Sequence, residues 1–284
     1  MSAAVKLEAV RLTDADFEWV RRRIKAASGI DLHEGKRELV QGRMSRRLRA
    51  LGLTDFRSYR ELLDGPGGQA ELVEFTNVLT TNVTAFFREA HHFDRLSREV
   101  VPALAARGLR RIRVWSAGCS SGEEPYTIGM TLLEALGASA DQWDLKILAT
   151  DLDTSMVEQG ASGVYRVDRV DGMPRERLER WFLKGKGRRS GLVRVRPQLA
   201  RMMRFKQLNL METWPFKGSF DVIFCRNVMI YFDRPTRERL LRRFAERLAP
   251  GGWLFIGHSE SVEDALDVLE PAGQTSYRKR GGDG

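Results

Sequence analysis

A glycine turn followed by two acidic residues is the part of this chain whose residue types are best suited to chemistry. Residues 116–126 read SAGCSSGEEPY and follow a short apolar run at 112–115. Glycine lets a backbone approach a ligand closely, and the carboxylates of Glu123 and Glu124 can accept hydrogen bonds. Phosphates prefer helix N-termini, but two carboxylates at this place would repel them. The segment therefore favours a ligand with a cation or sugar hydroxyls over an anion.

Polar residues at the expected ends of other apolar strands could complete a ligand site. Asp151 ends one strand, Asn209 follows another, and Asn227 follows a third. Ligands of open parallel sheets bind beyond the carboxyl ends of the strands, where an acid can accept hydrogen bonds from both ribose hydroxyls. This pattern fits S-adenosylmethionine and also a dinucleotide. The turn lacks the GxGxxG run of dinucleotide folds, which favours S-adenosylmethionine.

The elements that must position these residues alternate between strands and helices. Apolar runs predict strands at 111–116, 145–150, 221–225 and 253–257, and helical patterns lie at 124–136, 154–160 and 235–248. Such alternation predicts an α/β fold with a mostly parallel sheet and helices on both faces. The interval 185–209 interrupts the rhythm, and its alternating runs at 192–196 and 203–208 predict an inserted antiparallel β-subdomain.

The N-terminal region has a purely helical pattern. Thr13 and Asp16 form a capping box, and Gly29 marks the end of the first helix. Further helical patterns run over 36–51, 56–63 and 70–79. We therefore expect a small helical domain at 1–80 and an α/β domain at 81–284.

Composition limits the class of protein. The 284 residues carry a formal net charge of +9, and 42% of them are hydrophobic, which is enough for a core. The chain has neither the apolar stretch of roughly 20 residues that a membrane span needs nor a signal-peptide pattern, so we expect a cytoplasmic protein.

Cys119 and Cys225 are expected to be buried, reduced thiols. The positive charge suggests an acidic partner: a protein, a nucleic acid or a membrane surface. The residues from Arg278 onward are expected to form a frayed tail.

Three more motifs join the glycine turn and support a family resemblance. Residues 79–93 read LTTNVTAFFREAHHF, residues 225–232 read CRNVMIYF, and residues 257–260 read GHSE. With these motifs in this order, nearly the whole chain resembles the CheR family of bacterial chemotaxis receptor methyltransferases. The resemblance implies a helical domain and a Rossmann-like S-adenosylmethionine-binding domain with a small β-subdomain. It also implies methylation of glutamate side chains on receptor cytoplasmic helices during signal adaptation, with S-adenosylhomocysteine as the other product.

The resemblance also assigns residues to roles. Arg88 and Tyr231 match the residues nearest the transferring methyl group. The implied cofactor contacts are Asn82, Thr84, Arg88, Gly118, Glu124, Asp151, Asn209, Leu210, Asn227 and Val228, with the adjacent Glu123 as an alternative to Glu124. By residue type alone, Arg88 would be a structural ion-pair partner and Tyr231 a packing residue. His258 is taken as structural, and His91 and His92 are expected to start a helix.

The chemistry implied by the resemblance demands little of the protein. A glutamate acceptor is already ionised at neutral pH and needs no general base, and a sulfonium methyl donor needs no metal. The protein must align the reactants and exclude water. Arg88 could hold a carboxylate of the cofactor or of the substrate with its planar guanidinium, and Tyr231 could orient the attacking oxygen. Because the reaction removes charge, a site of low polarity favours it.

Basic residues predict where a substrate docks. Between Arg21 and Arg49 the chain has ten basic and three acidic residues. The basic stripe could be a plain solvated face, but the resemblance implies docking to acidic receptor helices, and the expected docking residues are Lys36, Arg43, Arg46, Arg47 and Arg49. Val40, Met44, Leu48 and Leu51 should face the core.

A second contact is implied by the glycine-containing loop with Gly185 and Gly187. In the family, the β-subdomain can bind a receptor's C-terminal tail peptide as an added strand. Nothing in the sequence requires more than a monomer. Two other functions stay open: a nucleic-acid methyltransferase, which the positive charge favours, and a non-catalytic S-adenosylmethionine-binding scaffold.

Overall fold

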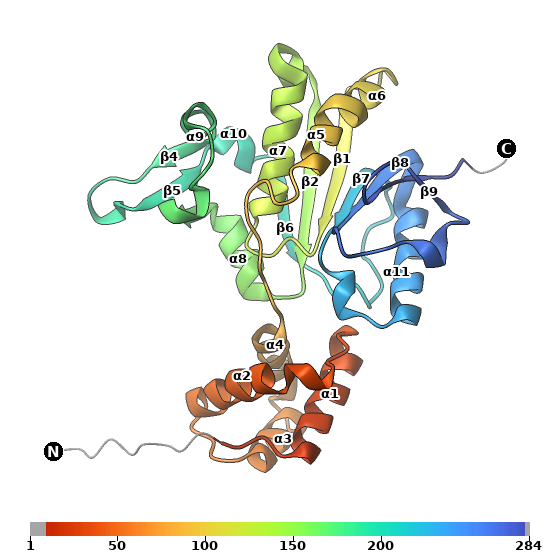
Figure 1. Cartoon of the computed structure of the whole chain (residues 1–284). Coiled ribbons are helices and arrows are strands. Elements are labelled where there is room, and N and C mark those ends of the chain that lie inside the picture. Colours follow the sequence, from red (N-terminus) through yellow and green to blue (C-terminus); the bar gives the residue numbers. More distant parts are fainter. Residues whose placement is uncertain (1–9, 282–284) are drawn as a thin grey trace. The chain divides into compact units, whose positions relative to one another are not determined.

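The structure is a computed structural model that describes residues 10–281 (Figure 1). Its contacts divide the chain into two compact units. One unit holds the chain up to Thr81 together with the short segment Tyr231–Asp233. The other holds Asn82–Ile230 and the chain from Arg234 onward. No helix among the described residues is long and apolar enough to cross a membrane.

The first unit is helical, as predicted. Thr13 caps its first helix, since its side chain accepts a hydrogen bond from the Asp16 backbone, and Gly29 ends that helix with a φ of 78°. The helices are α1 (Asp14–Ser28), α2 (Arg37–Ala50), α3 (Phe56–Asp64) and α4 (Gly68–Leu79). Val40, Met44 and Leu48 are buried as expected. The expectation for Leu51 was wrong: the residue is 36% exposed because α2 ends before it.

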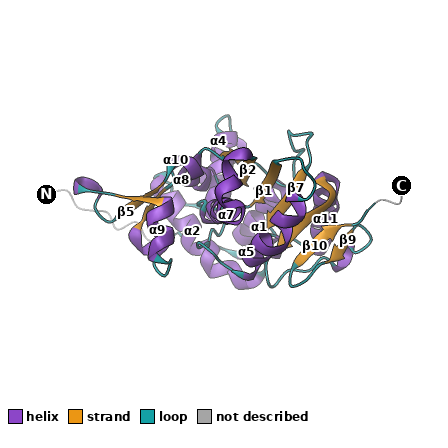
Figure 2. Cartoon of the chain, turned by 90° about the horizontal axis from the view of Figure 1, so that it is seen from above, coloured by secondary structure: helices purple, strands orange, loops and turns teal. Residues whose placement is uncertain are grey.

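The second unit contains a seven-stranded sheet in the order β6-β2-β1-β7-β8-β10-β9. Figure 2 shows β2, β1 and β7 side by side. The strands are β1 (Arg111–Ala117), β2 (Asp144–Asp151), β6 (Met203–Gln207), β7 (Phe220–Cys225), β8 (Leu248–Ile256), β9 (Leu269–Pro271) and β10 (Ser276–Lys279). The five strands from β6 to β8 pair in parallel, and β10 pairs antiparallel with β8 and β9. The predicted α/β fold is therefore confirmed.

Helices cover both faces of this sheet. On one face, Val114 joins a core cluster with residues of α5, α6 and α7. On the other face, the ring of its neighbour Trp115 lies 5.2 Å from Phe244 of α11. The longer helices are α7 (Glu123–Leu136), α8 (Thr154–Ser162) and α11 (Arg234–Arg247), and the short ones include α5 (His91–Arg95) and α6 (Val101–Ala105). Cys119 and Cys225 are buried free thiols, as expected.

A separate three-stranded antiparallel sheet has the order β3-β5-β4. Its strands are β3 (Val164–Arg166), β4 (Phe182–Lys184) and β5 (Leu192–Val195), with α9 (Arg175–Trp181) before β4 and α10 (Pro197–Ala200) after β5. The run at 203–208 was wrongly expected in this subdomain, because β6 pairs in parallel with β2 of the large sheet. Its alternation is that of an edge strand whose Phe205 packs against Gly160 of α8.

The C-terminal region also differs from the expectation. Arg278 and Lys279 lie in β10 rather than in a frayed tail. Arg278 pairs with Trp253 of β8, and its guanidinium lies 5.5 Å from the centre of the Trp253 ring. This segment is held in place by strand pairing with β8 and by stacking on the Trp253 ring. Its composition alone suggested a loose tail.

Candidate functional site

The glycine turn after β1 forms a tight, closely packed bend. The backbone N–H groups of Gly118 and Cys119 both donate to the Thr150 carbonyl, at 2.8 and 2.9 Å. Gly118 has a φ of 86°, and a Cβ built on it would lie 2.3 Å from Cγ2 of Val228. Gly122 has a φ of 97° and precedes the first residue of α7. Both glycines are required by the backbone conformation and by the close approach of their neighbours.

Asp151 ends β2 directly beside this turn. Its Oδ2 accepts a hydrogen bond from the Ser120 backbone at 2.7 Å, and its Oδ1 accepts one from the Asp153 backbone at 3.0 Å. The residue is 8% exposed, and this burial raises the pKa of its carboxyl group to about 6 despite the two hydrogen bonds. Each carboxylate oxygen can accept a further hydrogen bond, so Asp151 can bind ligand hydroxyl groups.

Hydrogen bonds bring other predicted residues to the same edge of the sheet. Asn82 Nδ2 donates to Asp153 Oδ2 at 2.6 Å, and the Asn82 carbonyl accepts from Ser120 Oγ at 3.1 Å. The Leu208 backbone donates to the Asp151 carbonyl at 2.9 Å, which places the following two residues next to Asp151. The structure thus gathers six predicted cofactor contacts here: Asn82, Gly118, Asp151, Asn209, Leu210 and Val228.

The two acids after the turn point into the protein and are already paired with cations. Glu123 is fully buried, accepts from Ser121 Oγ at 2.7 Å and forms an ion pair with Arg169. Glu124 accepts from Ser116 Oγ at 2.7 Å and lies 3.2 Å from Arg226 Nη1. Burial raises the pKa of Glu124. These pairings, which the sequence pattern does not show, remove the free negative charge expected at the turn.

Arg226 is the centre of a buried ionic network that sequence reasoning missed. Its guanidinium lies 3.2 Å from Glu89 Oε2 and 3.2 Å from Glu124 Oε2. Burial would raise the pKa of Glu89, but a 2.9 Å hydrogen bond with His258 and the Arg226 charge lower it to about 2. Asn227 Nδ2 also donates to Glu89, at 3.3 Å. Glu89 and Arg226 both stand within recognisable motifs, but no spacing in the sequence shows that they pair.

Glu260 shapes the loop after β7. This 8%-exposed carboxylate accepts backbone hydrogen bonds from Asn227 at 2.9 Å, Gly257 at 2.5 Å and Ile230 at 3.2 Å. Asn227 is held with a φ of 59°, a left-handed conformation that few residues other than glycine adopt. The loop that carries the predicted contacts Asn227 and Val228 is therefore fastened by one buried side chain.

The two residues predicted to be catalytic fall in different units. Arg88 is half-buried in the α/β unit, and its Nη1 donates to the Val83 carbonyl at 2.8 Å. Tyr231 groups with the helical unit, where its hydroxyl donates to the Thr81 carbonyl at 3.4 Å. Thr84, a predicted cofactor contact, accepts from Arg169 through its carbonyl at 2.8 Å. The catalytic assignments stay predictions.

The predicted docking residues of the helical unit separate into two groups. Arg43 donates to the Leu79 carbonyl at 2.9 Å, and Arg47 forms two hydrogen bonds with Glu71, at 3.0 and 2.5 Å. These two arginines are half-buried. Arg43 ties α2 to the C-terminal end of α4, and Arg47 ties it to the first turn of α4. Lys36, Arg46 and Arg49 are exposed. The basic pattern of the sequence does not distinguish these two groups, because it does not show which side chains form hydrogen bonds within the domain.

The glycine-containing loop is the hairpin between β4 and β5. The Gly185 backbone donates to the Leu192 carbonyl at 2.9 Å, and a Cβ on Gly185 would lie 2.0 Å from the Arg189 carbonyl oxygen. Gly187 has a φ of 58°. β4 is an edge strand of its sheet.

Comparisons with known proteins match both units. Residues 82–278 match the family model of the CheR methyltransferase SAM-binding domain, and residues 15–80 match that of the CheR methyltransferase all-alpha domain. The chain is 46% identical to a chemotaxis protein methyltransferase of Salmonella typhimurium, over 94% of this chain and 90% of that protein. It is 46% identical to chemotaxis protein methyltransferase 2 of Pseudomonas aeruginosa, over 93% of each chain. A chemotaxis protein methyltransferase of Borreliella burgdorferi is 40% identical over 88% of this chain and 89% of its own length.

Proposed function

The chain belongs to the CheR family of S-adenosylmethionine-dependent chemotaxis protein methyltransferases, and we propose that its methyl acceptors are glutamate side chains of chemoreceptor cytoplasmic helices. The products would be glutamyl methyl esters and S-adenosylhomocysteine, and the enzyme would act at membrane receptors from the cytoplasm. The observation that supports this proposal most is the glycine turn beside the buried Asp151, in a chain that matches the family over both units.

The residues present fit the cofactor. Gly118 lets the turn pack closely against Val228, another assigned cofactor contact, and Asp151 offers acceptors for ribose hydroxyls. When bound, S-adenosylmethionine supplies a methyl group on a sulfonium centre as the electrophile. We assign its binding to Asn82, Thr84, Arg88, Gly118, Asp151, Asn209, Leu210, Asn227 and Val228. Glu124 is also assigned to the cofactor, with the adjacent Glu123 as the alternative, and its carboxylate is held in place by Ser116 and Arg226.

We assign Arg88 as the cation that holds a carboxylate of the cofactor or of the substrate. Arg226 is committed to Glu89 and Glu124, whereas Arg88 uses one guanidinium nitrogen, Nη1, on the Val83 carbonyl. Within the described part of the chain, its Nε and Nη2 form no hydrogen bond and can hold both oxygens of a carboxylate. We propose that Tyr231 orients the acceptor oxygen. An ionised glutamate needs no proton removed before it attacks, so the contribution of these residues is alignment and exclusion of water.

Receptor docking is proposed at two places. The exposed basic residues Lys36, Arg46 and Arg49 can meet acidic receptor helices. The half-buried Arg43 and Arg47 would support α2 rather than contact the receptor directly. The edge strand β4 and the hairpin with Gly185 and Gly187 can accept a receptor tail peptide as an added strand.

The test is transfer of radiolabelled methyl groups from S-adenosylmethionine to receptor-bearing membranes. Label that mild alkali releases as methanol would identify a glutamyl ester. Alkali-stable label would indicate N-methylation and favour the nucleic-acid or protein-amine alternatives, and cofactor binding without transfer would favour a scaffold. Arg88→Ala should lower the rate by at least about 100-fold, equivalent to about 3 kcal/mol, while the exposed Arg98→Ala serves as the matched control.

A further inference from the structure

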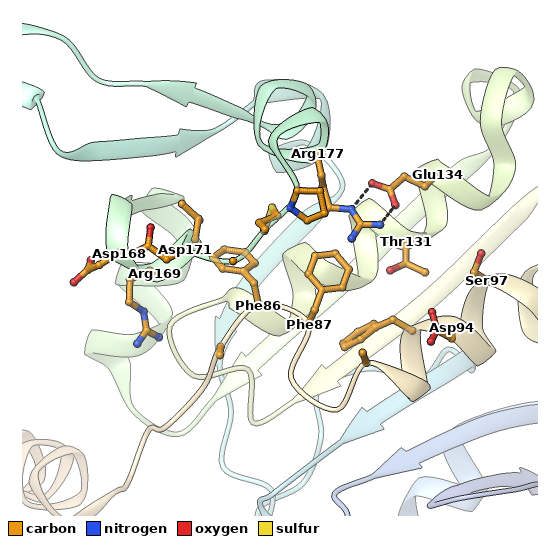
Figure 3. A pocket seen from close by; sticks show the side chains of 17 residues that line it. Phe86, Phe87, Asp94, Ser97, Thr131, Glu134, Asp168, Arg169, Asp171 and Arg177 are labelled. Carbon is orange, nitrogen blue, oxygen red and sulfur yellow. Dashed lines mark hydrogen bonds and ion pairs between the residues drawn. The ribbon is translucent and has the colours of Figure 1, made fainter.

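A cavity of about 550 Å³ lies in the α/β unit between the loop at 85–94, α7 and the segment at 168–177 (Figure 3). Its volume is in the range of sites that hold a small organic ligand or two side chains. None of its lining residues belongs to the proposed cofactor contacts. The cavity is therefore a separate feature that methyl transfer does not explain.

The centre of the cavity is apolar. Phe86 and Phe87 are half-buried, Phe93 is 3% exposed, and Met173 and Pro174 add further apolar surface. Figure 3 shows Phe86 and Phe87 in the middle of the view, with Asp171 and Asp94 on opposite sides of them. Such a floor suits an apolar or aromatic side chain.

The two arginines of the lining are already neutralised. Arg177 forms hydrogen bonds with Glu134 at 3.0 and 2.6 Å, and its guanidinium lies 4.3 Å from the centre of the Phe87 ring. Arg169 forms an ion pair with the fully buried Glu123 and donates to the Thr84 carbonyl. Neither arginine is available to bind an anionic ligand without losing its carboxylate partner.

Two carboxylates remain uncompensated at the rim. Asp168 pairs with Arg166 at 3.2 Å, but the side chains of Asp94 and Asp171 form no hydrogen bond or ion pair with any residue that the structure describes. Both are exposed and both line the cavity. An apolar floor between two unpaired negative charges is complementary to an apolar group flanked by positive charges.

We propose that this cavity binds a polypeptide partner through an aromatic side chain flanked by Arg or Lys residues. The aromatic side chain fills the apolar floor, and the basic side chains meet Asp94 and Asp171. The site is distinct from the cofactor site and does not depend on the identity of the methyl acceptor.

The experiment titrates the full-length protein with the peptide acetyl-Arg-Phe-Arg-amide and follows binding by ligand-observed NMR. We expect saturable binding with a Kd below about 1 mM, weakened by added salt. Asp94→Asn and Asp171→Asn should each raise the Kd at least threefold, and the double variant at least tenfold. Asp141→Asn, an exposed acid in the turn after α7, should leave the Kd unchanged.

Four results would overturn the proposal. They are equal binding of acetyl-Glu-Phe-Glu-amide, an unchanged Kd in a folded double variant, displacement of the peptide by S-adenosylhomocysteine, and binding of free spermidine as tight as that of the peptide. The third result would place the peptide in the cofactor site. The fourth would make the cavity a site for a diffusible polyamine rather than for a protein.

Discussion

Glu260 Oε2 accepts a hydrogen bond from the backbone of Asn227 at 2.9 Å, and Asn227 has a left-handed φ of 59°. The same carboxylate also fastens Gly257 and Ile230. The left-handed conformation of Asn227 costs about 1 kcal/mol or more. The buried Glu260 carboxylate maintains it, although Glu260 is not among the residues assigned to contact the cofactor. Glu260 acts as a positioning residue for the loop that carries Asn227 and Val228.

The Glu260→Gln variant should raise the Kd for S-adenosylhomocysteine about tenfold, because an amide NH2 cannot accept the backbone hydrogen bonds that a carboxylate oxygen accepts. Calorimetric titration measures the Kd, and circular dichroism verifies the fold. The exposed Glu263→Gln is the control and should bind normally. An unchanged Kd in folded Glu260→Gln would show that the loop keeps its shape without this carboxylate.

The Gly118→Ala variant should weaken cofactor binding at least tenfold. The new Cβ would lie 2.3 Å from Val228 Cγ2, and the φ of 86° is strained for alanine. Adding Val228→Ala removes the clash and should recover part of the affinity. Gly108→Ala is the matched control, since Gly108 has a φ of 74° and open space around its Cβ position. Equal affinity in Gly118→Ala would contradict the close packing at the turn.

Cofactor binding should weaken as the pH falls through about 6. Burial raises the pKa of Asp151 to about 6, so its carboxylate is ionised at pH 7.5 and largely protonated at pH 5. Because the ionised form accepts hydrogen bonds from hydroxyls, the affinity should fall about tenfold over this range. Asp151→Asn should bind weakly with no pH dependence, whereas Asp144→Asn, at the opposite end of β2, should keep the wild-type profile. A flat profile in the wild type would exclude this role.

Acid should destabilise the fold through His92. This imidazole is fully buried, and burial followed by the nearby Arg226 charge lowers its pKa to about 3. In the unfolded chain, the pKa of this histidine is about 6.5. Below that pH the unfolded chain binds a proton that the folded chain does not bind, so the free energy of unfolding falls as the pH falls. Between pH 6.5 and pH 5 the loss should be about 2 kcal/mol. In urea unfolding, His92→Gln should lose less of its free energy of unfolding between these two pH values than the wild type does. The variant of the exposed residue, His33→Gln, should resemble the wild type.

Charge reversal should separate docking from folding on α2. Arg46→Glu with Arg49→Glu should raise the KM for receptor membranes about tenfold and leave the Kd for S-adenosylhomocysteine unchanged, because both side chains are exposed. Arg47→Glu should instead lower the Tm, because it removes the partner of the 6%-exposed Glu71. A normal KM in the double variant would move the docking surface elsewhere.

The sequence by itself determined the local elements and the glycine turn of the proposed cofactor site. The capping box of Thr13 and Asp16, the apolar strand that ends before Gly118 and the acid at Asp151 depend on nearby residues, so their patterns can be recognised along the chain. The family resemblance then linked these patterns to a methyltransferase.

Only the tertiary structure decided which distant groups meet. It placed β6 beside β2, ordered Arg278 in β10, paired Glu123 with Arg169, and joined Arg226 to two carboxylates. Helix and strand periodicity shows which face of an element is buried but not what lies opposite that face. Ion pairs and strand partners between residues far apart in sequence depend on the packing of whole elements, and that packing forms only when the chain folds.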